Sequence, residues 1–371
     1  MVSGTAACGG SRSGNFARPC SRDSGPPLER SPSWPTPHPA DYHVRSMARS
    51  QPPIALTVGD PAGIGPEIVA EVLADPALGQ EVHLLAIGPA CEAPTDFEPL
   101  QAFEDWSPAE GHAWLGSDGT GDWEKGVASA SSGQAALEAL RLGAELAQAR
   151  LVDGLVTAPV SKEALHLSGE RVEGQTQLLE RWARSERVEM LACARGLRVM
   201  PLTRHLPLLD ALKDIDGAKV FEALLFLDRG LRRLGFDRPR IALAGLNPHG
   251  GERGLFGTQE LDILFPASER ARGEGVDVGP PLPADSVFLR AAAGEFDAVL
   301  ALYHDQAFIP VKLHAPGEAV TLLLGLPYVR VSPAHGTAFD LAGSGRADAT
   351  NLRVAVRQAV RWIQRDSSSA T

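Results

Sequence analysis

Three histidines lie in turns that follow short apolar runs, and together they could hold a divalent metal ion. His205 occurs in Thr-Arg-His-Leu-Pro, His249 in Asn-Pro-His-Gly-Gly-Glu and His304 in Tyr-His-Asp-Gln. Three imidazoles gathered at strand ends suit Zn²⁺, Co²⁺ or Mn²⁺ and leave coordination positions open for a substrate. The three are far apart in the sequence, so spacing alone does not distinguish a metal site from three hydrogen-bonded structural histidines.

Two acidic and two basic residues have neighbours that suggest further chemistry. Asp285 in Pro-Ala-Asp-Ser and Asp305 after His304 could orient metal-bound histidines or act as acid and base. The alternative for both is a helix N-cap. Lys312 and Arg330 lie in apolar stretches, where a cation needs an anionic partner. That partner is either a substrate phosphate or carboxylate or an internal Asp or Glu.

Two glycine-rich segments could approach a nucleotide. Residues 59–67, Gly-Asp-Pro-Ala-Gly-Ile-Gly-Pro-Glu, follow an apolar run and open a helix, whose N-terminus favours an anion. They lack the Lys-Ser/Thr of a Walker A loop and do not read GxGxxG, so a tight strand-to-helix turn is the alternative. Residues 335–348 contain three further glycines after His335 and two aspartates, which suit a ribose and an adenine.

Strands and helices alternate from residue 52 onward. Apolar runs predict strands at 54–58, 82–87, 152–156, 199–202, 241–244, 298–302 and 320–324. Periodic patterns predict helices at 132–149, 218–234 and 349–364. Apolar strands alternating with helices favour an α/β fold with a mostly parallel sheet covered on both faces. In such sheets ligands bind at the carboxyl ends of the strands, where the polar turns lie.

Composition excludes several classes of protein. The chain has 371 residues, with 35 Lys and Arg against 46 Asp and Glu, which gives a net charge of -11. This balance is poor for a general nucleic-acid or anionic-membrane binder. There is no apolar run of 18 residues that would predict a transmembrane helix. The 4 cysteines form no CxxC pair, so we expect a reducing, cytoplasmic protein without disulfides.

The first 46 residues differ from the rest. They contain 8 Ser, 7 Pro and 5 Gly, a composition typical of disorder. We expect residues 1–46 to be disordered or to be an extension from an incorrect gene start, with Met47 as the true first residue.

Seven ordered motifs resemble the 4-hydroxythreonine-4-phosphate dehydrogenase family of pyridoxal phosphate biosynthesis. They are GDPAGIGPE, DGLVTAPVSKEAL, TRHLPLLDAL, LNPHGGERGLFGTQE, PLPADSVF, YHDQAFIPVK and GLPYVRVSPAHGTAFDLAGSGRAD. The first and last also resemble loops of isopropylmalate and isocitrate dehydrogenases. The resemblance implies two α/β/α domains with the active site in the cleft between them. Residues 47–160 plus 305–371 would form the nucleotide-binding domain, and residues 161–304 the second domain.

The resemblance also implies a reaction, its cofactors and its site residues. The reaction is the NAD-dependent oxidation and decarboxylation of 4-phosphooxy-L-threonine to 3-amino-2-oxopropyl phosphate, with one divalent ion (Zn, Co, Mn or Mg) per site. The ion would be shared across a homodimer and bound by His205, His249 and His304. The implied catalytic residues are Asp285, Asp305 and Lys312. The implied substrate contacts are Gln175, Thr176, Lys312, Thr321 and Arg330. The expected cofactor contacts are Gly336, Asp340, Gly343, Gly345 and Asp348.

Two positions depart from the family pattern. This chain reads Gly-Gln-Thr-Gln at 174–177 where the family has Gly-His-Thr-Glu, and it has Thr321 where the family has Asn. Glutamine can donate a hydrogen bond but cannot become cationic. Three hypotheses follow: the family's own enzyme, a related dehydrogenase and decarboxylase acting on a different 3-hydroxy acid, or a homologue that only binds ligand. The intact histidines, Lys312 and Arg330 speak against the third.

Overall fold

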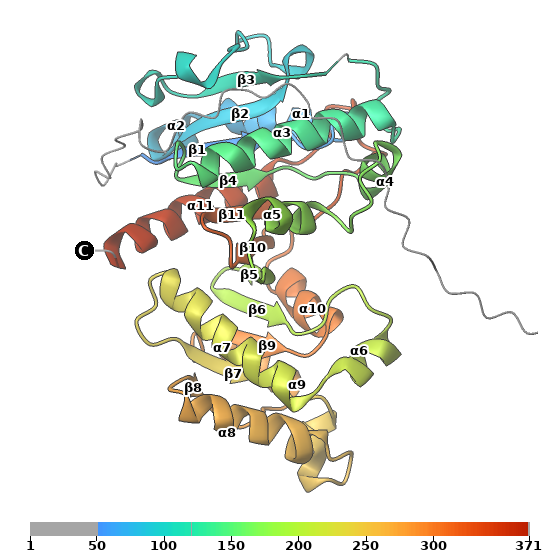
Figure 1. Ribbon diagram of the computed structural model, residues 1–371, viewed down its shortest axis with the longest axis vertical. Helices are drawn as coiled ribbons and strands as arrows, with labels where there is room; N and C mark the ends of the chain where they lie inside the picture. The colour runs from blue at the N-terminus through green and yellow to red at the C-terminus, as the bar shows by residue number, and fades with distance from the viewer. Residues whose placement is uncertain (1–50, 120, 370–371) are drawn as a thin grey trace, which may run out of the picture. The chain divides into compact units, whose positions relative to one another are not determined.

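One sheet of eleven strands runs through residues 51–119 and 121–369, which are the residues that the computed structural model describes (Figure 1). Its order is β3-β2-β1-β4-β11-β10-β5-β6-β9-β7-β8. The strands are β1 (Pro53–Thr57), β2 (His83–Pro89), β3 (Ala113–Ser117), β4 (Gly154–Thr157), β5 (Glu189–Ala194), β6 (Leu197–Pro201), β7 (Arg240–Leu243), β8 (Asp277–Val278), β9 (Ala298–Ala301), β10 (Val320–Leu324) and β11 (Val329–Pro333). The prediction for residues 1–46 lies outside the described residues.

The sheet is mostly parallel, as predicted, with a reversal in its middle. Strands β3, β2, β1, β4 and β11 are parallel, and so are β6, β9, β7 and β8. Between the two groups, β10 is antiparallel to β11 and β5, and β5 is antiparallel to β6. In Figure 1 the arrowheads of β3, β4, β6 and β9 nevertheless point to the same side.

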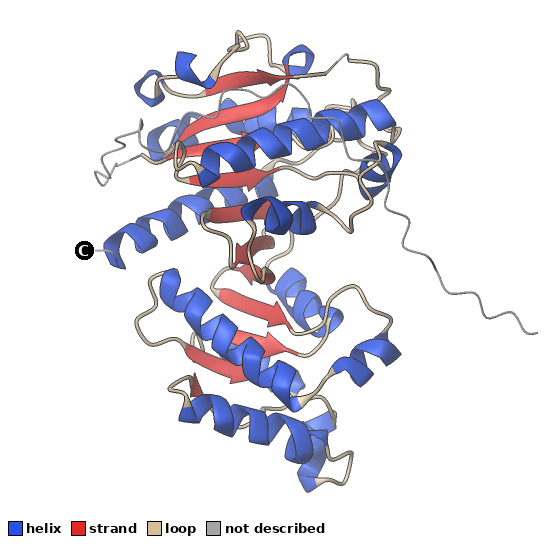
Figure 2. Ribbon diagram, in the orientation of Figure 1, coloured by secondary structure: helices blue, strands red, loops and turns tan. Residues whose placement is uncertain are grey.

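Helices cover the sheet (Figure 2). They are α1 (Gly65–Leu73), α2 (Pro76–Glu81), α3 (Ala130–Gln148), α4 (Lys162–Leu167), α5 (Gln175–Ala183), α6 (Leu208–Asp214), α7 (Gly217–Arg233), α8 (Phe265–Gly273), α9 (Ala284–Ala292), α10 (His304–His314) and α11 (Thr350–Ser369). The three predicted helices are α3, α7 and α11. Helix α3 packs on β1 and β2, while α11 packs on β4, β10 and β11.

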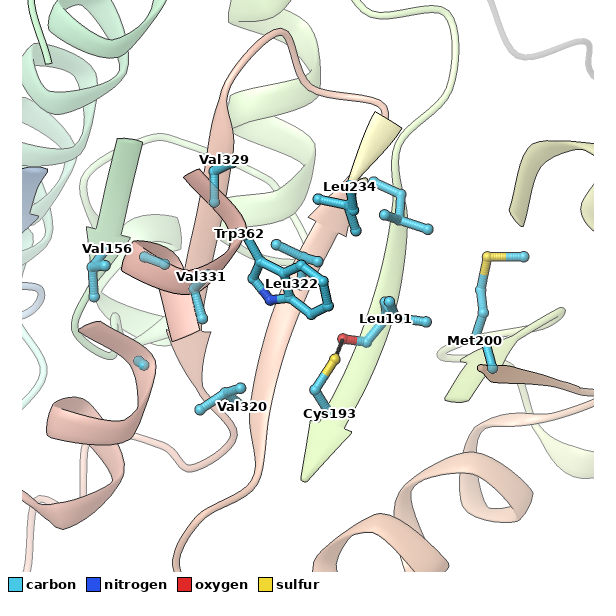
Figure 3. Close-up of a cluster of buried hydrophobic side chains, with 14 of the residues drawn as sticks. Val156, Leu191, Cys193, Met200, Leu234, Val320, Leu322, Val329, Val331 and Trp362 are labelled. Carbon is cyan, nitrogen blue, oxygen red and sulfur yellow. Dashed lines mark hydrogen bonds between the residues drawn. The ribbon is translucent and has the colours of Figure 1, made fainter. Parts of the chain in front are cut away.

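The C-terminal segment returns to the first half of the sheet. Strand β11 pairs with β4, and β10 pairs with β11 on its other side, although both strands come from the C-terminal part of the chain. Trp362 of α11 is 4% exposed and lies beside Leu322 of β10 and Val331 of β11 (Figure 3). The division into two domains and its boundaries stay a prediction. In the described part of the chain, no helix combines the length and the apolarity that a membrane span requires.

Candidate active site

His205 and His304 lie side by side at the end of neighbouring strands. They follow β6 and β9, which are parallel and adjacent, and their ring centroids are 5.9 Å apart. Two imidazole nitrogens about 2 Å from a shared Zn²⁺ would place the ring centroids roughly 5–6 Å apart. His304 also stacks on Phe308, one turn further along α10, with centroids 4.5 Å apart. The pair therefore has the separation that a shared divalent ion needs.

Each of the three predicted metal histidines has a carboxylate beside its Nδ1 atom. The distances are 2.7 Å from His304 to Asp305, 3.4 Å from His205 to Glu173 and 3.9 Å from His249 to Asp285. A carboxylate at one ring nitrogen orients the ring and leaves the other nitrogen for a metal, as in most metal-bound histidines. The imidazoles of His205 and His304 thus fit a borderline divalent ion at their Nε2 atoms, whereas the 3.9 Å separation at His249 is longer than a hydrogen bond.

The helix starts exclude one of the alternatives for Asp285 and Asp305. The N-cap residue of α9 is Pro283 and that of α10 is Tyr303, and neither helix has a side-chain cap at that position. The N-cap interpretation was therefore wrong for both aspartates, which instead lie in the first helical turns beside His249 and His304.

His249 does not join the other two histidines. Within residues 51–119 and 121–369, no three metal-ligating side chains converge. His249 follows β7, which lies on the far side of β9 from β6, and its side chain is 62% exposed. It begins a run of six residues with positive φ, from 53° at His249 to 98° at Gly254. Such strained backbone persists only where surrounding contacts impose it.

Arg330 is a buried cation held by neutral partners. It lies on β11, is 3% exposed, and its Nη2 donates to Thr157 Oγ1 at 2.5 Å and to Gln175 Oε1 at 3.0 Å. Its Nε has no partner among the described residues, and no described carboxylate pairs with it. Burial lowers the pKa of Arg330 to about 10. An internal Asp or Glu partner is therefore not found in the described chain, which leaves the guanidinium available to an anionic ligand.

Gln175 is brought to Arg330, whereas the other predicted substrate contacts are not. Its Nε2 donates to Ala158 O at 3.0 Å, so both ends of the amide are engaged. Thr176 is half-buried beside it, and Thr321 is 4% exposed on β10. Lys312 is exposed on α10 and makes no hydrogen bond or ion pair with any described residue. None of these three side chains contacts Arg330 through a hydrogen bond in the described structure.

The two glycine-rich segments lie together. Ile64 N donates to Thr337 O at 3.0 Å, and the Glu67 carboxylate accepts from the backbone amides of Gly343 and Gly345. The amides of these two glycines are therefore bound to Glu67. The sequence did not predict this role of Glu67. The available signal was its position in the first turn of α1, directly after a glycine-rich loop.

The other predicted cofactor contacts differ in their surroundings. Asp348 Oδ1 accepts from Thr350 N at 2.8 Å, at the start of α11, and these hydrogen bonds with Thr350 lower the pKa of Asp348. Gly336 and Asp340 are exposed on the loop. Neither of them is bound by Glu67 or Thr350, and the carbonyl oxygen of Gly336 lies 3.0 Å from Nδ1 of His335.

Comparison with known proteins identifies the family. The family model of the pyridoxal phosphate biosynthetic protein PdxA matches residues 88–359. The chain belongs to this family. It is 40% identical over 329 residues to a 4-hydroxythreonine-4-phosphate dehydrogenase from Beijerinckia indica, a match that covers 83% of this chain and 94% of the relative. It is 38% identical over 322 residues to a D-threonate 4-phosphate dehydrogenase from Salmonella typhimurium, covering 83% and 98%.

The fold agrees with a solved structure of the family. A 4-hydroxythreonine-4-phosphate dehydrogenase from Klebsiella pneumoniae superposes with a TM-score of 0.75 at 36% identity, covering 84% of this chain and 100% of that chain. The predicted family and fold class are thus confirmed, and this family member is an oxidoreductase. Dehydrogenase chemistry implies a nicotinamide cofactor.

Proposed function

We propose that this family member oxidises the secondary alcohol of a phosphorylated 3-hydroxy acid with NAD⁺, after which the 3-keto acid loses CO₂. The best-supported substrate is 4-phosphooxy-L-threonine, which would give 3-amino-2-oxopropyl phosphate for pyridoxal phosphate synthesis. The observation that carries the proposal is the His205–His304 pair with its Nδ1 carboxylates, in a chain of a dehydrogenase family.

The residues divide the work by their chemistry. A divalent ion, when bound, supplies positive charge that lowers the pKa of the substrate hydroxyl and stabilises the enolate left by decarboxylation. His205 and His304 would hold it through Nε2, while Glu173 and Asp305 fix the ring orientations. A bound nicotinamide would accept the hydride from C3, and a base of this chain would take the proton of the hydroxyl. Asp285 and Lys312 stay the proposed proton-holding groups for these steps and for protonation of the enolate carbon.

Arg330 would bind an anionic group of the substrate. Its guanidinium is buried, charged below its pKa of about 10, and bonded to a hydroxyl and an amide rather than to a carboxylate. A phosphate or carboxylate would satisfy the remaining donors through charge-assisted hydrogen bonds. Gln175 holds one side of the guanidinium, so substrate choice depends on this pair.

A second copy of the chain would complete the metal site. Apolar side chains are exposed beside each histidine: Leu206, Leu208 and Leu209 after His205, Leu255 and Phe256 after His249, and Ile309 and Leu313 after His304. Their exposed fractions reach 73% at Leu209 and Leu313. Large exposed apolar patches mark interaction surfaces. Because one chain gathers only two of the histidines, we propose a homodimer in which His249 serves the site of the partner subunit.

The proposed cofactor is NAD rather than NADP. Asp340 is exposed on the loop that Glu67 holds, and a carboxylate near the ribose disfavours a 2′-phosphate. An equal or higher kcat/KM with NADP would contradict this preference. The proposed compartment is the cytoplasm, with which the free thiols of Cys91 and Cys193 agree.

The test is NADH formation by purified protein supplied with 4-phosphooxy-L-threonine. Activity should vanish after chelation and return with Zn²⁺, Co²⁺ or Mn²⁺, and the protein should have the mass of a dimer by light scattering. Full activity of demonstrably metal-free protein would contradict the metal assignment. A fully active monomer would contradict the shared site.

A second candidate substrate is D-threonate 4-phosphate, which has a hydroxyl where 4-phosphooxy-L-threonine has an ammonium. The supporting observation is Gln175, a neutral amide that accepts from Arg330 where the family has a histidine. The Salmonella typhimurium relative carries the name of this activity. The ratio of kcat/KM for the two substrates, measured on one preparation, decides between them.

A further inference from the structure

A buried glutamine links two of the turns that carry the predicted metal histidines. Gln306, on the first turn of α10, is 8% exposed. Its Oε1 accepts from Leu302 N at 2.7 Å, and its Nε2 donates to Gly245 O at 2.8 Å. Leu302 follows β9 and Gly245 follows β7. One carboxamide thus bridges the ends of two neighbouring strands.

A buried threonine extends the link to the third turn. Thr203, which follows β6, is 4% exposed, and its Oγ1 donates to Leu302 O at 3.0 Å. The two polar groups of the Leu302 backbone are therefore bound by Thr203 on one side and by Gln306 on the other. Thr203 stands two residues before His205, Leu302 two before His304, and Gly245 four before His249.

These side-chain hydrogen bonds connect the three turns beyond the point where the backbone pairing of the strands ends. The ladder between β7 and β9 ends at Leu243 and Leu300, and the ladder between β6 and β9 ends at Pro201 and Ala301. One further backbone bond continues each ladder, from Ala244 N to Leu300 O and from Leu202 N to Ala301 O. Beyond these two backbone hydrogen bonds, the three turns are connected by the side chains of Thr203 and Gln306. Buried hydrogen bonds are costly to leave unmade, so they define a single register.

We propose that Gln306 and Thr203 are positioning residues: they fix the spacing of the three turns within one chain, and so place His205 and His304 for one site and His249 for the site of the partner subunit. The inference rests on the metal site of the proposed function and adds residues that contact neither metal nor substrate. The competing explanation is that both serve stability alone. The two explanations differ in whether metal affinity changes beyond what a general loss of stability produces.

The variants are Gln306→Met, which keeps the shape and loses both hydrogen bonds, and Thr203→Val, which is nearly isosteric and loses one. The matched control is Ser268→Ala. Ser268 is 1% exposed, and its hydroxyl donates to Phe265 O at 2.9 Å within α8, away from the three turns. Each protein is tested in full length for Co²⁺ affinity by chelator competition, for the visible spectrum of the Co²⁺-loaded form, and for the Tm of the metal-free form.

We expect Gln306→Met and Thr203→Val to weaken Co²⁺ binding about tenfold or more, the size of effect seen when groups behind metal ligands are altered. Their Co²⁺ spectra should shift, while Ser268→Ala keeps wild-type affinity and spectrum even if its Tm falls. Wild-type affinity and spectrum in both variants would overturn the inference alone. If Gln306→Met does not fold, Thr203→Val decides. Absence of Co²⁺ binding by the wild-type protein would instead overturn the metal site, and this inference with it.

Discussion

Gln175 and Arg330 meet inside the protein, where Nη2 of the guanidinium donates a 3.0 Å hydrogen bond to Oε1 of the amide. The other end of the amide donates to Ala158 O, so the glutamine is fixed in one orientation. A neutral imidazole at this position could accept from Arg330, but an imidazolium would face a buried cation. Gln175, which replaces the family's histidine, thus helps to fix the orientation of the Arg330 guanidinium.

The first prediction concerns Gln175→His. If 4-phosphooxy-L-threonine is the substrate, we expect kcat/KM on it to be unchanged or to rise by at most about ten- to thirtyfold, because 1.4 kcal/mol corresponds to one factor of ten. If the pocket is fitted to D-threonate 4-phosphate, kcat/KM on that compound should fall. Gln80→His is the control, because Gln80 is an exposed residue of α2 outside the candidate site. A sharp loss on 4-phosphooxy-L-threonine would contradict the proposed role.

The second prediction concerns Arg330→Met. The variant loses the cation that would bind the substrate anion, so we expect kcat/KM to fall at least about tenfold. Its Tm should be unchanged or higher, because burying a guanidinium without a carboxylate partner destabilises the folded protein. The pKa of Arg330 is about 10 in the folded protein, against an ordinary value of 12.5. Between these values the unfolded chain binds more protons, so this residue makes wild-type stability rise with pH above about 10.

The measurement is the Tm of wild type and Arg330→Met from pH 8 to pH 11. The difference in favour of the variant should shrink as the pH rises, because deprotonation removes the buried charge from the wild type. A variant that is strongly destabilised at pH 8 would mean that the guanidinium contributes more through packing and its bonds to Thr157 and Gln175 than its burial costs.

The third prediction concerns the carboxylate beside His304. Asp305→Asn keeps the size of the side chain but removes the charge that orients the imidazole from 2.7 Å. We expect Zn²⁺ or Co²⁺ affinity to fall about 10–100-fold and activity to be recovered at higher metal concentration. Asp210→Asn is a control, because Asp210 pairs with Lys213 on α6 outside the histidine pair. Activity lost without any change in metal affinity would assign Asp305 to acid–base chemistry instead.

The strands that consist of a continuous apolar run could be predicted from the sequence. All seven predicted strands correspond to β1, β2, β4, β6, β7, β9 and β10. Strand β8 was missed because it has two residues, and β3 because Ala-Trp-Leu-Gly-Ser carries a glycine and an edge serine. Strand β5 begins with Glu189, whose charge is balanced by Arg187 and Arg204 only in the folded chain.

The site was predictable in its residue types and less so in its contacts. His205, His304 and Asp305 were identified from turn motifs, and neighbouring parallel strands bring them together. Glu173 lies 32 residues before His205, so its contact depends on where α5 packs. Arg330 was recognised at the end of an apolar stretch, but its partners Thr157 and Gln175 are 173 and 155 residues away. Such contacts arise from tertiary packing, which no local pattern contains.

The last prediction concerns Glu67, which joins the two glycine-rich segments. Its carboxylate accepts from the amides of Gly343 and Gly345, and Glu67→Gln replaces one acceptor oxygen with a donor that faces an amide N–H. The loop that carries Asp340 should then lose one anchor. We expect KM for NAD to rise about tenfold, since one lost charge-assisted hydrogen bond is worth roughly 1.5–3 kcal/mol, of which loop relaxation recovers a part. Affinity for the divalent ion should stay at the wild-type value, because the three histidines lie on other turns.

Glu71→Gln is the matched control for this experiment. Glu71 lies on the same helix, α1, and pairs with Arg353 of α11 rather than with the loop. Steady-state kinetics with NAD as the varied substrate compare the two variants with wild type. An unchanged KM for NAD in Glu67→Gln would show that residues 335–348 do not contact the cofactor in the way proposed. An equal rise in the KM for NAD in both variants would mean that the effect comes from a change in α1 as a whole. It would then not come from loss of the Glu67 carboxylate that bridges the two loops.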